Sequence, residues 1–560
     1  MGVKIYDTTL RDGTQAEGIA FNVEAKVRVA KMLDDLGIHY LEGGWPGSNP
    51  NSIEFFERIR SVPLKHIRVA AFGSTRHKRN TPARDPNIRA LLETQMPVVT
   101  IFGKSWDLHV RDALRVSLQD NLAMISSTVA YLKKKGREVI YDAEHFFDGF
   151  KANPEYALST LDAAAKAGAD CLVLCETNGG AIPSEVAAIV REVRKRFPEA
   201  ELGIHTHNDS GCGVANALAA VEEGANHVQG TINGYGERCG NANLIPIIAN
   251  LELKMNRNVI GKRRLRLLTP VSRGVDELAN QIPDVRAPFV GSTAFAHKGG
   301  IHVSAVLRNA RCYEHVEPEA VGNRRRVLIS DQSGRANLAY KIGELGLDAD
   351  PSDPEVAAVL REVKELENRG YEFESAEASF ILMLEKAKRR LPLFFENATW
   401  RILNESIDGE NFVLGIVKVT VDGKEEHAVA EGDGPVNALD LALRRALSPF
   451  FPELSSVHLV DYNVRVLNAQ EATAAAVRVL ILSSDGHETW GTVGVSPNII
   501  DASWRALTDS LVYFLWKRSR KKTRPRGGNN RTRGGNNRPR KKSRRSWEKE
   551  TRGKRSGGER

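Results

Sequence analysis

Short apolar runs alternate with amphipathic stretches over the first 255 residues of the chain. Eight of the apolar runs have the length of buried strands, at 3–9, 38–42, 67–72, 98–102, 138–143, 171–175, 202–205 and 227–232. The stretches between them, such as 23–36, 121–135 and 185–196, place apolar residues at helical spacing. Strands that alternate with helices predict a parallel sheet. Eight such units over about 250 residues predict a closed (β/α)₈ TIM barrel, although an open doubly wound α/β sheet has the same alternation.

The pattern changes twice further along the chain. Residues 271–395 show mostly helical spacing, with glycine-containing breaks near Gly291 and Gly299. They predict helical linker subdomains that fold back over the mouth of a barrel formed by residues 1–270. Residues 396–516 combine strand patterns at 412–421, 458–466 and 474–482 with two helical patterns.

The two helical patterns in 396–516 repeat each other. Ala438, Ala442 and Leu443 recur 64 residues later as Ala502, Ala506 and Leu507, and a proline precedes each group. The repeat predicts an internally duplicated α+β domain, with chance spacing of helix-forming residues as the alternative. This domain contains no cluster of catalytic residue types, so we predict a regulatory role for it.

The basic residues are concentrated at the end of the chain. The net charge is +9, but residues 517–560 contain 20 Lys or Arg and 3 Glu, which leaves 59 basic and 67 acidic residues before them. The sequence RGGNN at 526–530 recurs at 533–537. So few apolar residues predict a disordered basic tail. Such a tail suits weak electrostatic binding to nucleic acid, or is a solubilising extension without a role in catalysis.

Composition limits the class of protein. With 41% hydrophobic residues the chain is able to bury sizeable cores. The five cysteines include no CxxC pair, which is typical of reduced thiols. The sequence shows no signal peptide and no run of 18 apolar residues. These features predict a cytoplasmic protein without a membrane span.

Polar side chains follow several of the predicted strands at the end where TIM barrels place their active sites. His205 and His207 are two residues apart, so on an extended strand their rings point the same way. Together with a facing carboxylate from Asp12 they predict a metal site with positions open to substrate. Imidazole favours Zn²⁺ and carboxylate favours Mg²⁺ or Mn²⁺. Structural histidines with satisfied hydrogen bonds are the alternative.

Two further charged residues at these strand ends are candidates for catalysis. Arg11 precedes Asp12, where a guanidinium would stabilise an oxyanion that forms on a bound substrate. A salt bridge at the barrel rim is the alternative. Glu144 follows the fifth strand, and its alternative role is that of a helix cap or rim charge.

Three motifs in this order are specific: DTTLRDG at 7–13, HTHND at 205–209 and GYGERCGN at 234–241. The chain resembles the 2-isopropylmalate, homocitrate and citramalate synthase family. The resemblance implies a metal-dependent transferase that condenses acetyl-CoA with a 2-oxo acid and converts the acyl group to alkyl on transfer. Segments 42–50 and 144–149 are most similar to the citramalate branch, which implies pyruvate as the acceptor, (R)-citramalate and CoA as products, and a place in isoleucine biosynthesis.

The alternatives within this family are 2-isopropylmalate and homocitrate synthases, which use larger 2-oxo acids. From a different class, a protein that acts mainly through nucleic-acid binding by its tail remains an alternative. The negative charge of residues 1–516 argues against it.

The resemblance also implies roles for individual residues. His302 would act as the general base or water activator and would reach over the barrel mouth together with Tyr313. Glu144, Thr177 and Asn208 would hold substrate, and Asn241 would lie at the metal. Glu176 stands where the family usually has aspartate, so no role is assigned to it. The family's C-terminal allosteric domain further implies a homodimer and isoleucine as the effector.

Overall fold

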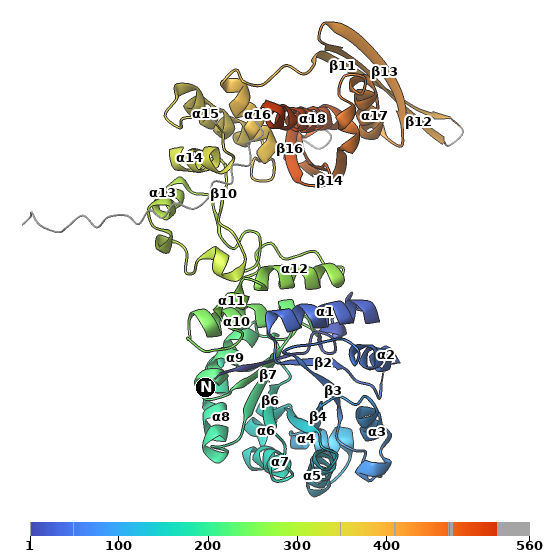
Figure 1. Ribbon diagram of the computed structural model, residues 1–560, viewed down its shortest axis with the longest axis vertical. Helices are drawn as coiled ribbons and strands as arrows, with labels where there is room; N and C mark the ends of the chain where they lie inside the picture. Colours follow the sequence, from blue (N-terminus) through green and yellow to red (C-terminus); the bar gives the residue numbers. More distant parts are fainter. Residues whose placement is uncertain are drawn as a thin grey trace, which may run out of the picture. The chain divides into compact units, whose positions relative to one another are not determined.

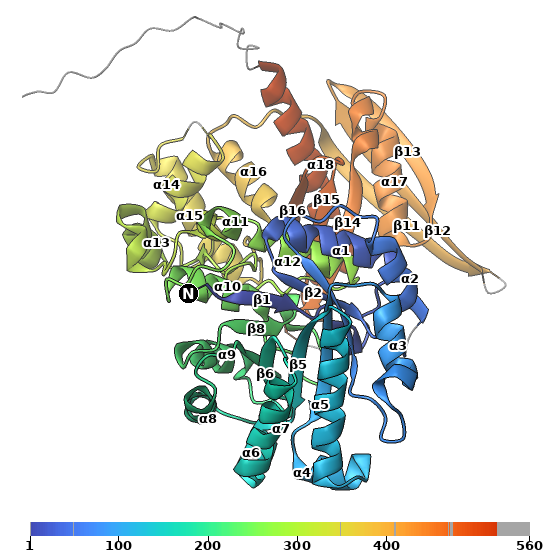
Figure 2. The ribbon, with the colours of Figure 1, turned by 60° about the horizontal axis from the view of Figure 1, so that its bottom comes forward.

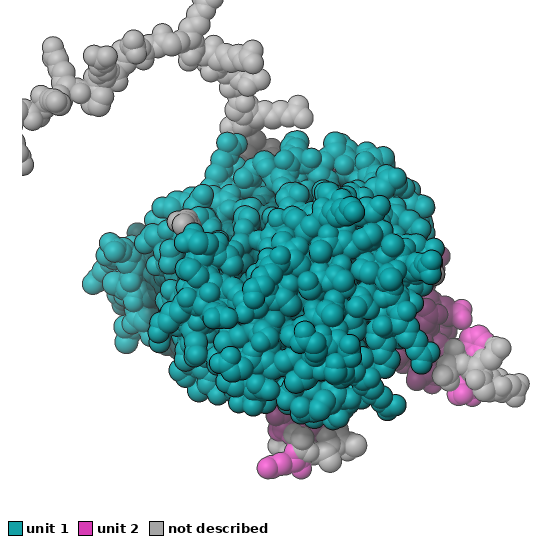
Figure 3. All heavy atoms as spheres, turned by 90° about the horizontal axis from the view of Figure 1, so that it is seen from below, with its two compact units in different colours: residues 1–374 teal, residues 375–560 magenta. Residues whose placement is uncertain are grey.

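The computed structural model describes residues 2–523 apart from Asn49, Asp348, Asp408, Gly409, Ala469 and 471–473. The chain divides into two compact units, residues 1–374 and 375–560, which Figure 3 shows in different colours. No helix among the described residues is long and apolar enough to cross a membrane.

The first unit is built on a closed barrel of eight parallel strands in sequence order (Figure 1). The strands are β1 Lys4–Asp7, β2 Tyr40–Gly44, β3 Arg68–Ser74, β4 Val98–Lys104, β5 Glu138–Glu144, β6 Cys171–Glu176, β7 Leu202–Thr206 and β8 His227–Gly230. β1 pairs with β8, so that Lys4 lies opposite His227, and this pairing closes the barrel. The predicted (β/α)₈ barrel is confirmed, and the open sheet is excluded.

Helices follow most of the strands and surround the barrel (Figure 2). They are α1 Val23–Leu36, α2 Pro50–Ile59, α3 Pro86–Glu93, α4 Asp107–His109, α5 Leu118–Lys134, α6 Phe146–Ala152, α7 Pro154–Lys166, α8 Pro183–Arg196, α9 Gly213–Glu222 and α10 Leu244–Leu253. The two ends of α1 show how the sequence determines where a helix begins and ends. The Asn22 side chain accepts a hydrogen bond from the amide of Ala25 at the first turn. Gly37, at φ 89°, supplies the left-handed residue that ends the helix.

Short helices and one small sheet complete the first unit. They are α11 Lys262–Leu265, α12 Leu268–Leu278, β9 Ala296–His297, α13 Gly300–Arg308, β10 Arg326–Val327, α14 Arg335–Glu344 and α15 Pro354–Asn368. The Asn323 side chain donates to the carbonyls of Phe289 and Gly291 at 3.0 and 2.9 Å, and so joins the loop before β10 to the loop before β9. Helices make up most of the regular secondary structure in this part of the chain, as its spacing predicts.

The second unit contains the predicted duplication. One three-stranded antiparallel sheet, β11 Glu396–Ile407, β12 Glu410–Val421 and β13 Lys424–Gly432, precedes α17 Pro435–Leu447. A second such sheet, β14 His458–Val466, β15 Val477–Ser484 and β16 Thr489–Ser496, precedes α18 Ile499–Thr523. The repeated alanine and leucine positions of α17 and α18 are all buried. The internal repeat therefore marks the face of each helix that packs in the core.

A helix that the sequence groups with the linker belongs to the second unit. α16, Glu377–Ala387, lies beyond the division between residues 374 and 375. Its Ser379 hydroxyl donates to Asp509 of α18 at 2.8 Å and accepts from the amide of Val493 of β16 at 3.2 Å. The second unit therefore begins about 20 residues before the strand pattern that marks it in the sequence.

The final helix runs further than predicted. The sequence predicts loss of order from Lys517, yet α18 continues to Thr523. Lys517 forms an ion pair with Glu488, and the guanidinium groups of Arg518 and Arg520 lie over the rings of Phe514 and Trp516. Lys517 also lies over the ring of Tyr513, so each of these basic groups contacts an aromatic ring one helical turn earlier, which favours continuation of the helix. Residues 524–560 lie outside the described residues, so nucleic-acid binding by the tail stays a prediction.

Candidate active site at the carboxyl ends of the barrel strands

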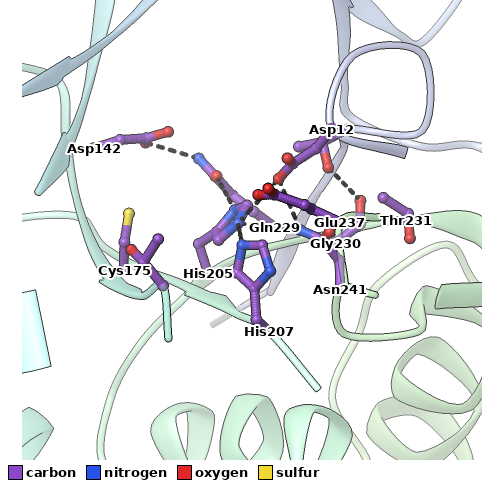
Figure 4. Close-up of polar contacts among 12 residues, drawn as sticks. Asp12, Asp142, Cys175, His205, His207, Gln229, Gly230, Thr231, Glu237 and Asn241 are labelled. Atoms are coloured by element: carbon purple, nitrogen blue, oxygen red, sulfur yellow. Dashed lines mark hydrogen bonds and ion pairs between the residues drawn. The ribbon is translucent and has the colours of Figure 1, made fainter. Parts of the chain in front are cut away.

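Two histidines and one aspartate converge at the carboxyl ends of β1 and β7. The ligand atoms of Asp12, His205 and His207 all lie within 4.8 Å of one another. His205 Nε2 is 3.2 Å from Asp12 Oδ2 and 3.4 Å from His207 Nε2. Figure 4 shows the two imidazole rings and the carboxylate facing the same space. The structure thus brings together the three residues that the sequence predicts as metal ligands.

A tight turn after β1 carries Asp12 to this position. The Asp7 carboxylate accepts hydrogen bonds from the amide and the hydroxyl of Thr9, at 3.0 and 2.8 Å. The Thr8 carbonyl then accepts the amide of Asp12 at 2.9 Å. Aspartate and threonine side chains favour such local turns, which explains why DTTLRDG leaves the strand abruptly.

Asn241 joins two of the three ligands. Its Nδ2 lies 2.8 Å from Asp12 Oδ2 and 3.1 Å from His205 Nε2. Its Oδ1 is buried and has no hydrogen-bond partner among the described residues. Rotation of the amide group by 180° would exchange Nδ2 and Oδ1. Asn241 is therefore able either to orient Asp12 and His205 through Nδ2 or to act as a further metal ligand through Oδ1.

The donor set fits a divalent cation. Two imidazole nitrogens and a carboxylate suit Zn²⁺, Mn²⁺ and related ions, and they leave positions open to substrate. His207 Nδ1 is buried without a hydrogen-bond partner among the described residues. Burial, followed by the charge of His205, lowers the pKa of His207 to about 4, which keeps it neutral. Burial opposes ionisation of Asp12, but Arg11 and then His205 hold the pKa of Asp12 well below its usual range.

Arg11 is held rigidly beside the cluster. Its Nη1 lies 3.1 Å from Asp12 Oδ1, and its Nε donates to the fully buried carboxylate of Glu42 on β2. The guanidinium also lies over the Phe72 ring, with Cζ 3.8 Å from the ring centroid. The Tyr6 hydroxyl donates to the other oxygen of Glu42 at 2.7 Å. Arg11 therefore presents a fixed positive charge next to Asp12, as its position in the sequence predicts.

Glu144 and Thr177 lie at the ends of the neighbouring strands β5 and β6. Glu144 forms an ion pair with Lys104. Thr177 Oγ1 accepts the amide of His145 at 3.0 Å, and the Thr177 carbonyl accepts from Arg238 at 2.7 Å. The Asn208 side chain accepts the amide of Gly213 at 3.0 Å, a contact that starts α9. The structure thus gives Asn208 a structural contact and gives Glu144 a counter-ion.

His302 and Tyr313 contact each other, with ring centroids 4.4 Å apart. Tyr313 is exposed, and His302 lies within α13. No hydrogen bond, ion pair or ring contact among the described residues joins either of them to Asp12, His205 or His207. The structure therefore brings these two residues to each other and not to the cluster.

The sequence assigns no role to three residues that support the site. Gln229 on β8 lies beside His205, Asp142 on β5 accepts a hydrogen bond from Gln229, and Glu42 holds Arg11. Burial and then the charge of Glu42 raise the pKa of Asp142 to about 7. All three are polar residues inside apolar strands. This pattern could have identified them in the sequence, because a buried polar group needs a hydrogen-bond partner.

Comparison with known proteins identifies related families for most of the chain. Residues 2–270 match the HMGL-like family, 289–371 the homocitrate synthase post-HMGL domain-like family, and 375–515 the LeuA allosteric (dimerisation) domain. A solved structure of an HMG-CoA lyase from Bacillus subtilis covers 50% of the chain and is covered over 94% of its own length, with 21% identity and a TM-score of 0.44.

Relatives of the whole chain are more similar. The (R)-citramalate synthases of Geobacter sulfurreducens and Aquifex aeolicus are 55% and 51% identical to it over 517 residues, which cover 92% of this chain and 98% of each relative. A probable 2-isopropylmalate synthase from Methanopyrus kandleri is 31% identical over 508 residues, 90% of this chain and 96% of that protein. The resemblance that the three motifs indicate is confirmed. The chain belongs to the (R)-citramalate synthase family.

Proposed function

We propose that the chain condenses acetyl-CoA with pyruvate and water to give (R)-citramalate and CoA. The observation that carries the proposal is the position of Arg11, which is fixed beside the Asp12, His205 and His207 cluster. A 2-oxo acid has adjacent keto and carboxylate oxygens, and this combination of metal donors and a guanidinium suits such a group. Relatives at 46–55% identity that are named (R)-citramalate synthase support pyruvate over larger 2-oxo acids.

Asp12, His205 and His207 would hold the divalent ion, with Asn241 beside it. When bound, the ion would polarise the keto group of the substrate. Arg11 would stabilise the negative charge that develops on the keto oxygen as the new carbon–carbon bond forms. Because Glu42 and Phe72 already fix the guanidinium, little reorganisation is needed during the reaction.

The remaining roles follow from the family resemblance. Glu144, Thr177 and Asn208 would contact substrate. His302, with Tyr313, would remove a proton from the acetyl group or activate the water that cleaves the thioester, because imidazole titrates near neutral pH. We propose that residues 375–515 form a homodimer and bind isoleucine as an inhibitor, in line with the LeuA allosteric (dimerisation) domain that they match.

CoA release with different acceptors tests the substrate. We expect kcat/KM to be highest with pyruvate and lower with 2-oxoisovalerate and 2-oxoglutarate. A pocket that fits pyruvate excludes bulk by steric clash, whereas a larger pocket would discriminate against pyruvate only by about 1–3 kcal/mol per missing methylene. Preference for 2-oxoisovalerate or 2-oxoglutarate would move the chain to another branch of the family.

Removal of the metal tests the site. Chelation should abolish CoA release, and adding back Mg²⁺, Mn²⁺ or Zn²⁺ in turn should identify the ion that restores it. His205→Ala and Asp12→Asn should each lower kcat by orders of magnitude, because several kcal/mol of charge stabilisation would be lost. Full activity of a metal-stripped His205→Ala/His207→Ala double variant would contradict the assignment.

A further inference from the structure

A second group of metal-binding side chains lies at the opposite end of the barrel strands. Cys171 is the first residue of β6, Glu201 precedes β7, and His227 is the first residue of β8. Their ligand atoms all lie within 4.8 Å of one another. Glu201 and His205 are four positions apart along extended chain, a span of about 13 Å. The group is therefore distinct from the Asp12 cluster.

Strand pairing holds the three residues together. The amide of Leu172 donates to the Glu201 carbonyl at 2.9 Å, which fixes the start of β6 beside the start of β7. Gly203 of β7 pairs with His227 of β8. Because the barrel is closed, backbone hydrogen bonds set this arrangement and no flexible loop is needed to form it.

His227 has no satisfied polar contact. The residue is 0% exposed, and neither ring nitrogen makes a hydrogen bond among the described residues. The nearest carboxylate oxygen, Glu201 Oε1, is 3.8 Å from Nδ1, which is beyond hydrogen-bond range. The rings of Tyr6 and Tyr40 lie 5.4 and 5.6 Å from the imidazole and limit its rotation. A buried imidazole without partners is costly, and this cost needs an explanation.

We propose that Cys171, Glu201 and His227 bind a transition-metal ion of the zinc class. A thiolate, an imidazole and a carboxylate are all zinc ligands, whereas Mg²⁺ and Ca²⁺ do not take sulfur. Ligand atoms around a tetrahedral zinc ion lie about 3.3–3.8 Å apart, given zinc–ligand distances of 2.0–2.3 Å. For an oxygen and a nitrogen ligand the expected separation is about 3.3–3.5 Å, so the Glu201 to His227 distance of 3.8 Å would have to shorten by a few tenths of an ångström. The remaining adjustment is within the reach of the Cys171 and Glu201 side chains.

Charge balance favours a divalent ion at this position. A thiolate and a carboxylate would neutralise its two positive charges, so that the occupied site would carry no net charge in the barrel interior. Cys171 is 3% exposed, and burial followed by the charge of Glu201 raises its pKa well above the usual range. The sulfur–hydrogen bond would therefore break as the sulfur–metal bond forms, and the proton would leave to solvent.

Lys4 occupies the outer side of the group and would have to move. Its Nζ lies 2.6 Å from Glu201 Oε2, and its side chain is 40% exposed, so it is able to turn into solvent. A surface cavity of about 570 Å³, lined by Lys4, Tyr40 and Glu201 among others, leads to this carboxylate. An ion would thus enter past Glu201, whose side chain is the most exposed of the three.

Cobalt titration of the metal-stripped full chain tests the proposal. Co²⁺ substitutes for Zn²⁺, and a thiolate ligand gives it a charge-transfer band in the near ultraviolet that a site of imidazole and carboxylate lacks. We expect two equivalents of Co²⁺ to bind to the wild-type chain and the thiolate band to develop with one of them. Added Zn²⁺ should then bleach the band.

Matched variants assign the band. Cys171→Ser should bind one equivalent and show no band, and His227→Gln should behave in the same way. Cys175→Ser is the control, because Cys175 is a buried cysteine on the same strand, and it should keep the band. Zn²⁺ should also raise the thermal midpoint of the wild type more than that of Cys171→Ser, since the ion would join three strands. A wild-type chain without a thiolate band, or a band that survives in Cys171→Ser, would overturn the proposal.

Discussion

His205 Nδ1 lies 2.9 Å from Gln229 Oε1, and Gln229 Nε2 donates to Asp142 Oδ1 at 3.0 Å. This chain of contacts crosses the barrel interior from β7 through β8 to β5 (Figure 4). With its amide nitrogen committed to Asp142, Gln229 presents its oxygen to His205, so that His205 Nδ1 carries the proton. In the neutral ring that a metal ligand requires, the lone pair of Nε2 then faces Asp12 and His207.

Replacement of Gln229 should therefore weaken metal binding. We expect Gln229→Ala to raise the metal Kd by about 10–100-fold, as loss of such supporting contacts does at other metal sites. Calorimetric titration of the metal-stripped chain measures the change, and saturating metal should restore most of the activity. Gln119→Ala, on the exposed surface of α5, is the control. An unchanged Kd in Gln229→Ala would show that the amide does not orient His205.

Glu42 should matter for catalysis although it reaches the proposed metal ligands only through Arg11. Glu42→Gln removes the charge that holds Arg11 Nε, and we expect kcat to fall by about 100-fold, with a smaller change in KM, because a misplaced guanidinium stabilises the transition state less. Circular dichroism should show a folded barrel. Glu24→Gln, which removes an exposed partner of Arg58, should leave kcat unchanged. Equal losses in both variants would contradict this role.

Most of the barrel could be predicted from sequence because its strands are buried on both faces and stand out as apolar runs. The second unit was harder. β13 has the sequence KEEHAVAEG and β16 has TWGTVGVS, and neither has a clear apolar run or alternation. The glycines of β16 serve packing: a Cβ at Gly491 would clash with the Ser375 carbonyl, and one at Gly494 with the Ala502 carbonyl. From the sequence alone, a glycine that allows close approach of a neighbouring backbone cannot be distinguished from a glycine in a turn.

The site likewise contains residues that could be predicted from the sequence and residues that could not. The spacing of His205 and His207 and the position of Asp12 predicted that these three side chains lie together, because the direction of a strand fixes where its end lies. The residues that hold the cluster come from β2, β5 and β8, and only barrel closure and strand register bring them to it. A single glutamine such as Gln229 gives no periodic signal, so its contact with His205 could not be predicted.

The division at residue 374 predicts where the chain tolerates truncation. A chain that ends at Glu374 should stay monodisperse in size-exclusion chromatography. A chain that ends at residue 395 should aggregate, because α16 would keep Phe380, Ile381 and Leu384 without the β16 and α18 surfaces that bury them. If only the chain that ends at Glu374 aggregated, the division between residues 374 and 375 would be contradicted.

The chain that ends at Glu374 also tests the proposed regulation. Without residues 375–560 it should lose inhibition by isoleucine, since effector binding there must favour a less active state to inhibit. Measuring CoA release with and without isoleucine, alongside the oligomeric state, separates loss of the sensor from loss of the dimer. Inhibition that persists in the chain ending at Glu374 would place the effector site in the first unit.

Asp509 on α18 makes the stability of the second unit depend on pH. Burial raises its pKa from 3.8 to about 6, against the opposing hydrogen bond from Ser379 and the charge of Lys386. The folded state therefore holds a proton that the unfolded state has already lost between about pH 4 and pH 6. The stabilisation is fully present below pH 4 and is lost as the pH rises through 6, by at most about 3 kcal/mol.

Asp509→Asn should remove this loss, because an amide keeps the acceptor for Ser379 and carries no charge into the core. We expect the thermal midpoint of the variant relative to wild type to rise between pH 4.5 and pH 7.5, as scanning calorimetry of the second unit's transition would measure. Asp501→Asn is the matched control, since Asp501 lies on the same helix with its carboxylate partly exposed. A midpoint difference that stays constant with pH in Asp509→Asn would mean that Asp509 is ionised in the folded chain as readily as in the unfolded one, and that burial alone does not set its charge.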